Sequence, residues 1–387
     1  MKSARPLAIA LTVLLGGCAQ QVALRHEPES ERPHLVALPP DQCRSLIGDD
    51  SSPQTLQNAM AHSLEYLSRV PSERTWTALD RQVRAGALYD LLSALQTGAA
   101  GSDWTERACA LATVYRIEAP EGMLVTGYYQ PELAASRSRT NRFRYPLYRM
   151  PDDLVDIDFS QWCPECGRRV VQGRVKEGHL IPYYSRREID AGILERRGYE
   201  IAWLEDPVEA FFMHVQGSAV LRFDDGVQMH VSYSSSNGRP YTSIGRVLIE
   251  RGRLTRENLS MQALKDYLRA HSDEQAEIMS TNERYIFFRT VTNGPIGSLG
   301  VPLTAGRSIA ADAAVYPPGA LVFMKIAPRP EAANSTSTAR LALIQDSGIA
   351  ITGPGRLDVY WGTGATAEAI AGDMRNPGEL YLVLPRD

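Results

Sequence analysis

Hydrophobic residues recur at helical spacing in the first third of the chain. Separations of three and four positions, which place apolar side chains on one helix face, relate Leu56, Met60, Leu64 and Leu67, and again Leu88, Leu91, Leu92 and Leu95. The pattern predicts a third helix over 103–114. We therefore expect the folded part of the chain to begin with helices.

Alternation of apolar and polar residues replaces the helical period from residue 123 onward. In MLVTGYYQPEL (123–133), Leu124, Thr126 and Tyr128 alternate with the residues between them, which favours a strand. A helix begins with the proline at 207 and leads into a hairpin that ends at 224–226. From 285 to the C-terminus nearly every segment has a strand or turn pattern, and a polar loop at 328–340 is expected to be a flexible excursion between two strands.

Helix starts in the middle of the chain carry their own signals. Ser185 with Glu188, and Ser272 with Gln275, have the spacing of capping boxes, and further helices are expected over 242–251 and 260–271. Short strands separated by glycine turns favour a closed β-barrel near the C-terminus, because closure removes exposed strand edges. We predict a mainly β fold with helices, of the α+β class.

The first 18 residues have the pattern of a bacterial lipoprotein signal peptide. Two basic residues precede an apolar run, 7–15, that is too short to span a bilayer. The following Leu-Gly-Gly-Cys resembles a lipobox, so we expect lipid attachment at Cys18 and a polar tether over 19–44; a secretory signal with a chance cysteine is the alternative. Because no aspartate follows Cys18, the outer membrane is favoured, with the protein facing the periplasm of a Gram-negative bacterium.

Composition and charge exclude some functions. The chain is long enough for two domains, and its 44% hydrophobic and 22% charged residues are ordinary for a globular protein. Its 41 basic and 45 acidic residues give a net charge of -4, which argues against nucleic acid as a partner.

A CPEC motif places Cys163 and Cys166 at the spacing of half a zinc site. No second such motif occurs, and an oxidising compartment favours disulfides. We therefore interpret the motif as structural, with a local disulfide favoured over metal, and we expect no metal and no cofactor.

Three aspartates, Asp312, Asp346 and Asp358, each follow a strand-like segment of apolar or small residues. Asp346 and Asp358 are twelve positions apart in LIQDSGIAITGPGRLDVYWGTG (343–364). The glycine turns around them are typical of places where a rigid scaffold presents polar groups at its rim. A turn-forming role, in which the carboxylate bonds nearby backbone, is the alternative for each.

From about Gly127 to the C-terminus, the chain resembles the membrane-bound lytic murein transglycosylase A family, with its C-terminal three-aspartate barrel domain. The resemblance is carried by TGYYQP, YPLYR, SRREIDAG, HVQGSA, NGRPYTSIGRVLIERG, MQAL, VPLTAGRSIAAD, PPG and QDSGIAITGPGRLDVYWG. It implies a double-psi β-barrel formed by 45–133 and 296–387, an inserted β-rich glycan-binding domain at 134–295, and a groove between them. The segment at 152–182 looks like an insertion that not every member shares.

The resemblance also implies a reaction. This is non-hydrolytic cleavage of the β-1,4 bond between N-acetylmuramic acid and N-acetylglucosamine, with closure of a 1,6-anhydro ring. One aspartate acts as general acid and then as base, so its pKa has to rise from about 4 towards 6. Asp358 is our candidate for this acid and Asp346 for a supporting carboxylate that raises its pKa or orients it. For Asp312, a structural role in the barrel and a functional role both remain open.

Glycan contacts are expected from amides, hydroxyls and aromatic rings. The candidates are Tyr128, Tyr129, Gln216, Ser218, Asn237, Asp312 and Tyr360. Core filling is the alternative for the two adjacent tyrosines, and an essential role is not expected for His214. The expected partners are peptidoglycan strands, outer-membrane lipid through Cys18, and other cell-wall enzymes.

Two other functions fit parts of the pattern. The DSG sequence at 346–348 resembles the loop of aspartic proteases, which need two such aspartates where this chain has one. A catalytically silent peptidoglycan-binding lipoprotein would use the same groove, although retention of all three aspartates argues against it. A hydrolase would differ from a transglycosylase by leaving reducing ends.

Overall fold

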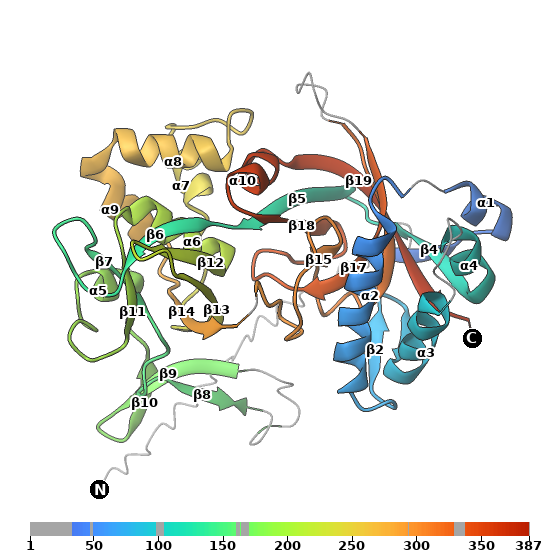
Figure 1. Ribbon diagram of the computed structural model, residues 1–387, viewed down its shortest axis with the longest axis horizontal. Helices are drawn as coiled ribbons and strands as arrows, with labels where there is room; N and C mark the ends of the chain where they lie inside the picture. The colour runs from blue at the N-terminus through green and yellow to red at the C-terminus, as the bar shows by residue number, and fades with distance from the viewer. Residues whose placement is uncertain are drawn as a thin grey trace, which may run out of the picture. The chain divides into compact units, whose positions relative to one another are not determined.

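The computed structural model describes residues 33–46, 49–97, 104–159, 163, 170–292, 294–328 and 337–386. The predicted signal peptide, Cys18 and most of the predicted tether lie outside these residues. Pro33–Asp387 forms one compact unit. Within the described residues, an eight-stranded and a six-stranded sheet position the site (Figure 1).

The N-terminal part contains the predicted helices. Its elements are β1 (His34–Ala37), α1 (Pro40–Ser45), α2 (Pro53–Ser68), β2 (Thr75–Ala78), β3 (Arg81–Arg84), α3 (Ala85–Gln96), α4 (Trp104–Leu111) and β4 (Ala112–Glu118). The helix predicted to reach residue 114 ends at Leu111, because the chain enters β4 and pairs with β19 (Arg375–Pro385). Strand β1, which lies inside the segment predicted to be a tether, pairs with β4.

Two cysteines that the sequence left unassigned form a disulfide. Cys43 on α1 and Cys109 on α4 are bonded with a Cα–Cα distance of 5.9 Å, which ties the start of the fold to α4. Cys163 is also disulfide-bonded, and Cys166 lies outside the described residues.

Six strands of the eight-stranded sheet close into a ring. They are β5 (Met123–Gln130), β15 (Ser308–Ala310), β16 (Leu321–Ile326), β17 (Thr338–Asp346), β18 (Arg356–Thr363) and β19. The circuit runs β5–β18–β15–β17–β16–β19 and returns to β5, which pairs with both β18 and β19. Val125, Leu357 and Val359 are buried in the hydrophobic core. Because strand side chains alternate, Thr126 and Asp358 face the other side of the ring wall.

The six-stranded sheet begins directly after β5. Its strands are β6 (Glu132–Ser136), β7 (Tyr145–Tyr148), β11 (Glu200–Leu204), β12 (Ser218–Phe223), β13 (Gln228–Ser236) and β14 (Ile286–Val291). The helices in this part are α5 (Arg186–Asp190), α6 (Pro207–Gln216), α7 (Ile244–Glu250), α8 (Met261–Ala270) and α9 (Ser272–Ser280). The predicted insertion at 152–182 forms a separate small sheet of β8 (Val155–Asp158), β9 (Val170–Lys176) and β10 (His179–Pro182).

One of the two predicted capping boxes is present. Ser185 and Glu188 cap α5 reciprocally. The box predicted at Ser272 is wrong, because His271 is the N-cap of α9 and no side chain caps it. Gln275 instead donates through Nε2 to the carbonyl of Leu268 on α8, at 3.1 Å.

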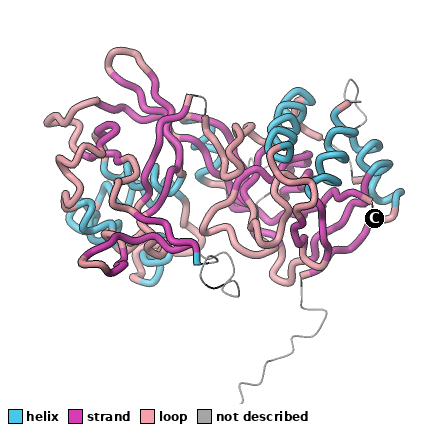
Figure 2. Tube along the Cα trace, turned by 90° about the horizontal axis from the view of Figure 1, so that it is seen from below, coloured by secondary structure: helices cyan, strands magenta, loops and turns pink. Residues whose placement is uncertain are grey.

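Helix α10 (Ala365–Gly372) lies in a region that the sequence predicted as strand and turn. It packs on β5 at very short range: a Cβ added to Gly127 would lie 2.8 Å from the Cα of Ala371. Strands and loops account for much of the traced chain, with the helices in groups beside them (Figure 2). Among the described helices, none is both long and apolar enough to cross a bilayer.

Candidate active site

The ring strands bring Asp346 and Asp358 to the two sides of one short strand. Asp346 on β17 and Asp358 on β18 are both paired in register with Ala310 on β15. Adjacent strands lie about 4.8 Å apart, so a single strand separates the two backbones. All three residues line the same cavity.

This cavity has a volume of about 1240 Å³ and is lined from both large sheets. The ring contributes Thr126 and Tyr128 together with the two aspartates, while α6 and β12 contribute Gln216 and Ser218. Pockets for small molecules usually measure about 300–1,000 Å³. The space therefore suits an extended ligand that lies across both parts of the molecule.

Asp358 retains its proton to unusually high pH. Burial raises the pKa of its carboxyl from 3.8 to about 6. Thr126, whose hydroxyl donates to Oδ1 at 2.7 Å, and Arg356 lower this pKa, whereas the charge of Asp346 makes a smaller contribution that raises it. A carboxyl with this pKa can donate a proton near neutral pH and accept one afterwards.

Replacing Thr126 with valine is expected to raise the pKa of Asp358 further, by about one unit, because a hydrogen bond that favours the carboxylate is lost. The pKa can be measured by following the Asp358 carboxyl carbon by NMR across pH 4 to 9. Thr126→Ser is the matched control, since it keeps the hydroxyl. An unchanged or lowered pKa in the valine variant would mean that the hydroxyl does not stabilise the carboxylate.

Asp346 is held by three donors. Its Oδ2 accepts from the Tyr128 hydroxyl at 2.8 Å, and its Oδ1 accepts from the backbone N–H groups of Ser298 and Ser347 at 2.8 and 2.9 Å. Burial raises the pKa of Asp346, and these hydrogen bonds oppose the rise. The carboxylate is therefore well placed to orient Tyr128.

Tyr128 and Tyr360 form a tilted ring pair with centroids 5.4 Å apart. They face each other across the β5–β18 register, two positions beyond Thr126 and Asp358. Tyr128 is half-buried and lines the cavity, whereas Tyr360 is buried behind it. The pair therefore places two aromatic rings on the same strands as Thr126 and Asp358, on the same face of the ring wall.

Tyr129 lies away from the cavity. It is 1% exposed and packs with Ala367 and Ala371 of α10, and its hydroxyl accepts from Nζ of Lys265 at 3.3 Å. The surroundings of Tyr129 therefore fit core filling, the alternative role considered for this residue.

Gln216 and Ser218 do reach the cavity. Gln216 accepts a hydrogen bond from the N–H of Tyr129 through Oε1, at 3.1 Å, and its Nε2 lies 3.7 Å from the sulfur of Met261. Ser218 is buried where β12 begins. These residues bring the end of α6 and the start of β12 to the cavity that the aspartates also line.

The structure does not bring Asn237 to the cavity lining. Its Nδ2 donates to the carbonyls of Tyr184 and Glu283, and its Oδ1 accepts from the N–H groups of Arg239 and Tyr285. The amide, 1% exposed, joins three chain segments and has no capacity left for a glycan.

Asp312 lines the cavity, but backbone N–H groups occupy both of its oxygens. Oδ1 accepts from Ala314 at 2.9 Å and Oδ2 from Gly353 at 2.7 Å. It thereby joins the turn after β15 to the loop before β18. This geometry fits the turn-forming alternative.

His214 also lines the cavity, in a buried position beside Arg186. The Nη2 of Arg186 lies 3.2 Å from its Nδ1. Burial and the arginine charge lower the pKa of His214, which keeps the ring neutral at physiological pH.

Sequence reasoning missed three polar residues beside Asp358: Thr126, Arg356 and Arg375. Thr126 is paired with Asp358 on one side and with Arg375 on the other. The alternation of β5 puts Thr126 on the same face as Tyr128, and this pattern could have identified Thr126 from the sequence. Arg356 precedes Asp358 by two residues on β18, a spacing from which strand alternation could have placed it on the same face. Arg375 lies on a separate strand, β19, whose pairing no local pattern reveals.

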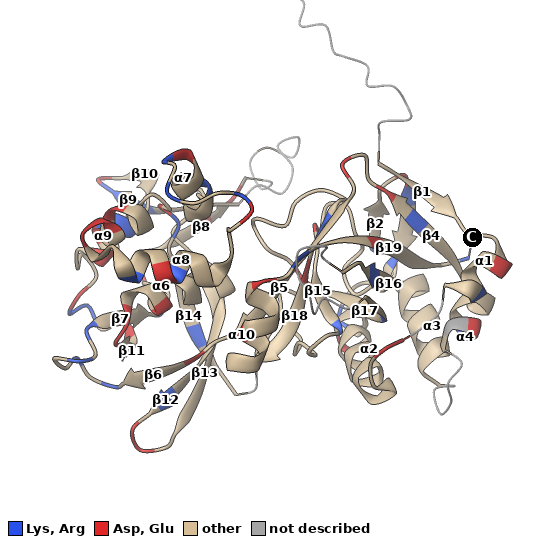
Figure 3. Ribbon diagram, turned by 90° about the horizontal axis from the view of Figure 1, so that it is seen from above, with Lys and Arg blue, Asp and Glu red and all other residues tan. Residues whose placement is uncertain are grey.

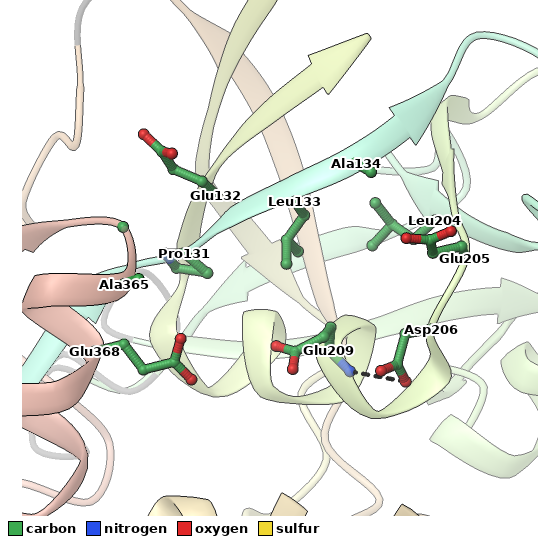
Figure 4. A pocket seen from close by; sticks show the side chains of 11 residues that line it. Pro131, Glu132, Leu133, Ala134, Leu204, Glu205, Asp206, Glu209, Ala365 and Glu368 are labelled. Carbon is green, nitrogen blue, oxygen red and sulfur yellow. Dashed lines mark hydrogen bonds between the residues drawn. The ribbon is translucent and has the colours of Figure 1, made fainter. Parts of the chain in front are cut away.

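A smaller cavity of about 370 Å³ lies between β6, α6 and α10 (Figure 4). The side chains of Glu209 and Glu368 extend into the same space, and Lys265 of α8 bonds to both, at 2.8 and 2.6 Å. Basic and acidic residues lie close together around α6 and α8 (Figure 3). Through these ion pairs Lys265 joins α8 to α6 and α10. In the described part of the chain, no group of three or more His, Cys, Asp or Glu is placed to hold a metal ion.

A carboxyl with a raised pKa lines an extended cavity close to a tyrosine pair, an arrangement typical of acid–base sites that take a large ligand. Comparison with known proteins agrees. A family model described as the MltA specific insert domain matches residues 124–289, and one described as the 3D domain matches 307–384. The chain is 34% identical over 263 residues to membrane-bound lytic murein transglycosylase A of Escherichia coli K12. That match covers 67% of this chain and 64% of the relative, which is less than two thirds of its length.

Solved structures show the same likeness over more of the chain. A membrane-bound lytic murein transglycosylase from Agrobacterium tumefaciens has a TM-score of 0.78 at 36% identity, covering 87% of this chain and 94% of that one. The Escherichia coli MltA structure with bound chitohexaose has a TM-score of 0.70 at 27% identity, covering 88% and 92%. The chain belongs to the membrane-bound lytic murein transglycosylase A family.

Proposed function

We propose that this protein is a peptidoglycan lytic transglycosylase in which Asp358 serves as general acid and then as general base. The observation that carries the proposal is the Asp358 carboxyl, whose pKa is raised to about 6 and which lines the large cavity. The relative crystallised with chitohexaose binds a glycan. A glycan strand in the cavity of this chain would pass between the two large sheets.

The proposed reaction needs one carboxyl and no added water. Protonated Asp358 donates its proton to the glycosidic oxygen as the bond from C1 of N-acetylmuramic acid to that oxygen breaks. The carboxylate then takes the proton from the C6 hydroxyl of the same sugar, whose oxygen bonds to C1. Asp358 ends the cycle protonated, and the products are a free hydroxyl and a 1,6-anhydro ring.

The neighbouring residues would position the substrate and the acid. Asp346 holds the Tyr128 hydroxyl, and Tyr128 would present its ring to a sugar while shielding Asp358 from water. Gln216 and Ser218, which line the same cavity, would contact sugar groups from α6 and β12. Asp346 is thus proposed as a positioning residue.

The finer fold assignment is also proposed. The closed ring of six strands supports a double-psi β-barrel split into 45–133 and 296–387, and the six-stranded sheet supports an inserted domain at 134–295. The match to the 3D domain at 307–384 lies within the second part of the proposed barrel, and the match to the insert domain at 124–289 covers most of the proposed inserted domain.

We further propose a lipid anchor at Cys18 in the outer membrane, with the catalytic part in the periplasm and other cell-wall enzymes as partners. The relatives are named membrane-bound, and the lipobox supplies the chemistry of attachment.

The product identifies the reaction. Full-length protein purified in detergent is incubated with isolated sacculi, and the soluble muropeptides are analysed by mass spectrometry. We expect products one water lighter than their reducing counterparts, as ring closure requires. Reducing ends would identify a hydrolase, and intact sacculi would favour a binding protein; either result would overturn the proposal.

A further inference from the structure

Two arginines lie beside the proposed acid on the same face of the ring wall. Arg375 on β19 is paired with Thr126 on β5, and Thr126 is paired with Asp358 on β18. Arg356 is two residues before Asp358 on β18, so strand alternation puts it on the same face. Both arginines line the cavity.

These arginines form no ion pair with a carboxylate among the described residues. Arg356 donates through Nη1 only to the carbonyl of Leu357 at 3.3 Å. Other arginines of the ring are paired: Arg340 bonds to Asp50, and Arg307 bonds to Asp49, each at 2.8 Å. The two arginines without a close carboxylate partner are thus ones that face the cavity.

The two guanidinium groups are close enough to repel each other. Burial lowers the pKa of Arg356, Asp358 raises it, and the charge of Arg375 lowers it again. Cavity-lining Asp373 forms no ion pair with either arginine in the described structure. A carboxylate arriving from the cavity would relieve this repulsion and would accept charge-assisted hydrogen bonds from the guanidinium donors.

We propose that Arg356 and Arg375 form a carboxylate-binding subsite for the acidic peptide that murein carries on its muramic acid residues. This inference rests on the proposed function, because the sugar whose C1 is attacked also carries the peptide. Arg375 is two strands from Asp358, roughly 10 Å, which separates peptide recognition from the reacting bond. The subsite is expected to favour glycan strands that carry the peptide over strands that lack it.

The test compares murein glycan strands with and without their peptides, the latter prepared with an amidase. KM and kcat for release of anhydro ends are measured for the full-length protein and for Arg375→Ala. We expect the variant to raise KM about ten-fold on peptide-bearing strands, as loss of one charged hydrogen-bonding partner implies, and to raise it much less on peptide-free strands, which keep only the lactyl carboxylate that the amidase leaves on each muramic acid. Arg375→Lys should recover part of the loss, since it restores the charge without the planar fork.

Arg256→Ala is the matched control. Arg256 is exposed and lies outside the cavity lining, and its replacement by alanine removes the same charge. Equal KM changes on both substrates, or none, would overturn the subsite. Binding of both strand types to Asp358→Asn and to Asp358→Asn/Arg375→Ala is measured in parallel. If no variant or parent protein releases anhydro ends, the proposed function fails, while selective loss of peptide-bearing strands in the binding assay would still support the subsite.

Discussion

Asp358→Asn is expected to slow the formation of anhydro ends by about 10² to 10⁴-fold, because the proposed mechanism removes its acid and its base together. The amide cannot donate a proton to the glycosidic oxygen or accept one from the C6 hydroxyl. The rate is measured by mass spectrometry of products from sacculi at pH 5 to 8. In the parent protein, kcat/KM should fall above about pH 6, where Asp358 loses the proton needed for the first step.

The same substitution is expected to stabilise the fold at neutral pH. The pKa of Asp358 is about 6 in the folded protein against 3.8 in an unperturbed carboxyl, so the folded state binds more protons between these values. The free energy of unfolding of the parent protein therefore decreases as pH rises from about 4 to 6, by at most about 3 kcal/mol from this group. Asparagine does not titrate, so the variant should be more stable than the parent at pH 7.5 and lose that advantage near pH 4.

Urea unfolding at pH 4 and 7.5 measures this difference. Asp266→Asn is the control, since Asp266 is an exposed residue on α8 whose side chain bonds to Gln262. Neither the activity nor the stability of this variant protein should change much. An Asp358→Asn protein that retains near-normal activity would assign the proton transfer to another group. An Asp358→Asn protein that is less stable than the parent at pH 7.5 would show that ionisation of Asp358 does not lower the free energy of unfolding.

Arg307→Met is expected to lower the free energy of unfolding by about 3–5 kcal/mol, the cost of breaking a buried ion pair by removing one partner. The Arg307 side chain is 0% exposed and bonds through Nη1 to Asp49 and to the carbonyl of Leu341. Nε donates to the Thr55 hydroxyl and Nη2 to the carbonyl of Ser52. Methionine fills similar volume but leaves a carboxylate and several acceptors without their donor.

Urea unfolding at pH 7.5 tests this prediction, with Arg246→Met as the matched control. Arg246 is 67% exposed and pairs with Glu250 one turn along α7, so its replacement should cost less than about 0.5 kcal/mol. A loss below about 1 kcal/mol in Arg307→Met would show that the buried network contributes little to the attachment of α2 to the ring. Arg307 belongs to a segment that carries the family resemblance, and its surroundings assign it to structure.

Local patterns in the sequence predicted many elements well. The leucine spacing of α2 and α3, the capping box at Ser185 and the alternation in β5 all reflect interactions within a few residues. The errors arose where distant partners decided the outcome. Residues 112–114 become strand because β19 pairs with them, and the alanine-rich α10 forms where β5 offers the bare backbone of Gly127.

The candidate site shows the same division. The family resemblance selected Asp346 and Asp358, and the structure places both in one cavity. It could not separate Tyr128, which lines the cavity, from Tyr129, which packs under α10, because adjacent strand residues point in opposite directions. Asn237 and Asp312 were indistinguishable from ligand-binding residues until their hydrogen bonds to backbone were known.

The sequence by itself determined the periodicity of the helices and strands, the lipoprotein pattern of the N-terminus and the aspartates that carry the resemblance. The tertiary structure decided which polar side chains meet. Strand register sets Thr126 in line with Asp358 and with Arg375, although Thr126 is more than 200 residues from either of them in the chain. Burial, which raises the pKa of Asp358, depends on atoms contributed by many distant segments, so only the folded chain could reveal it.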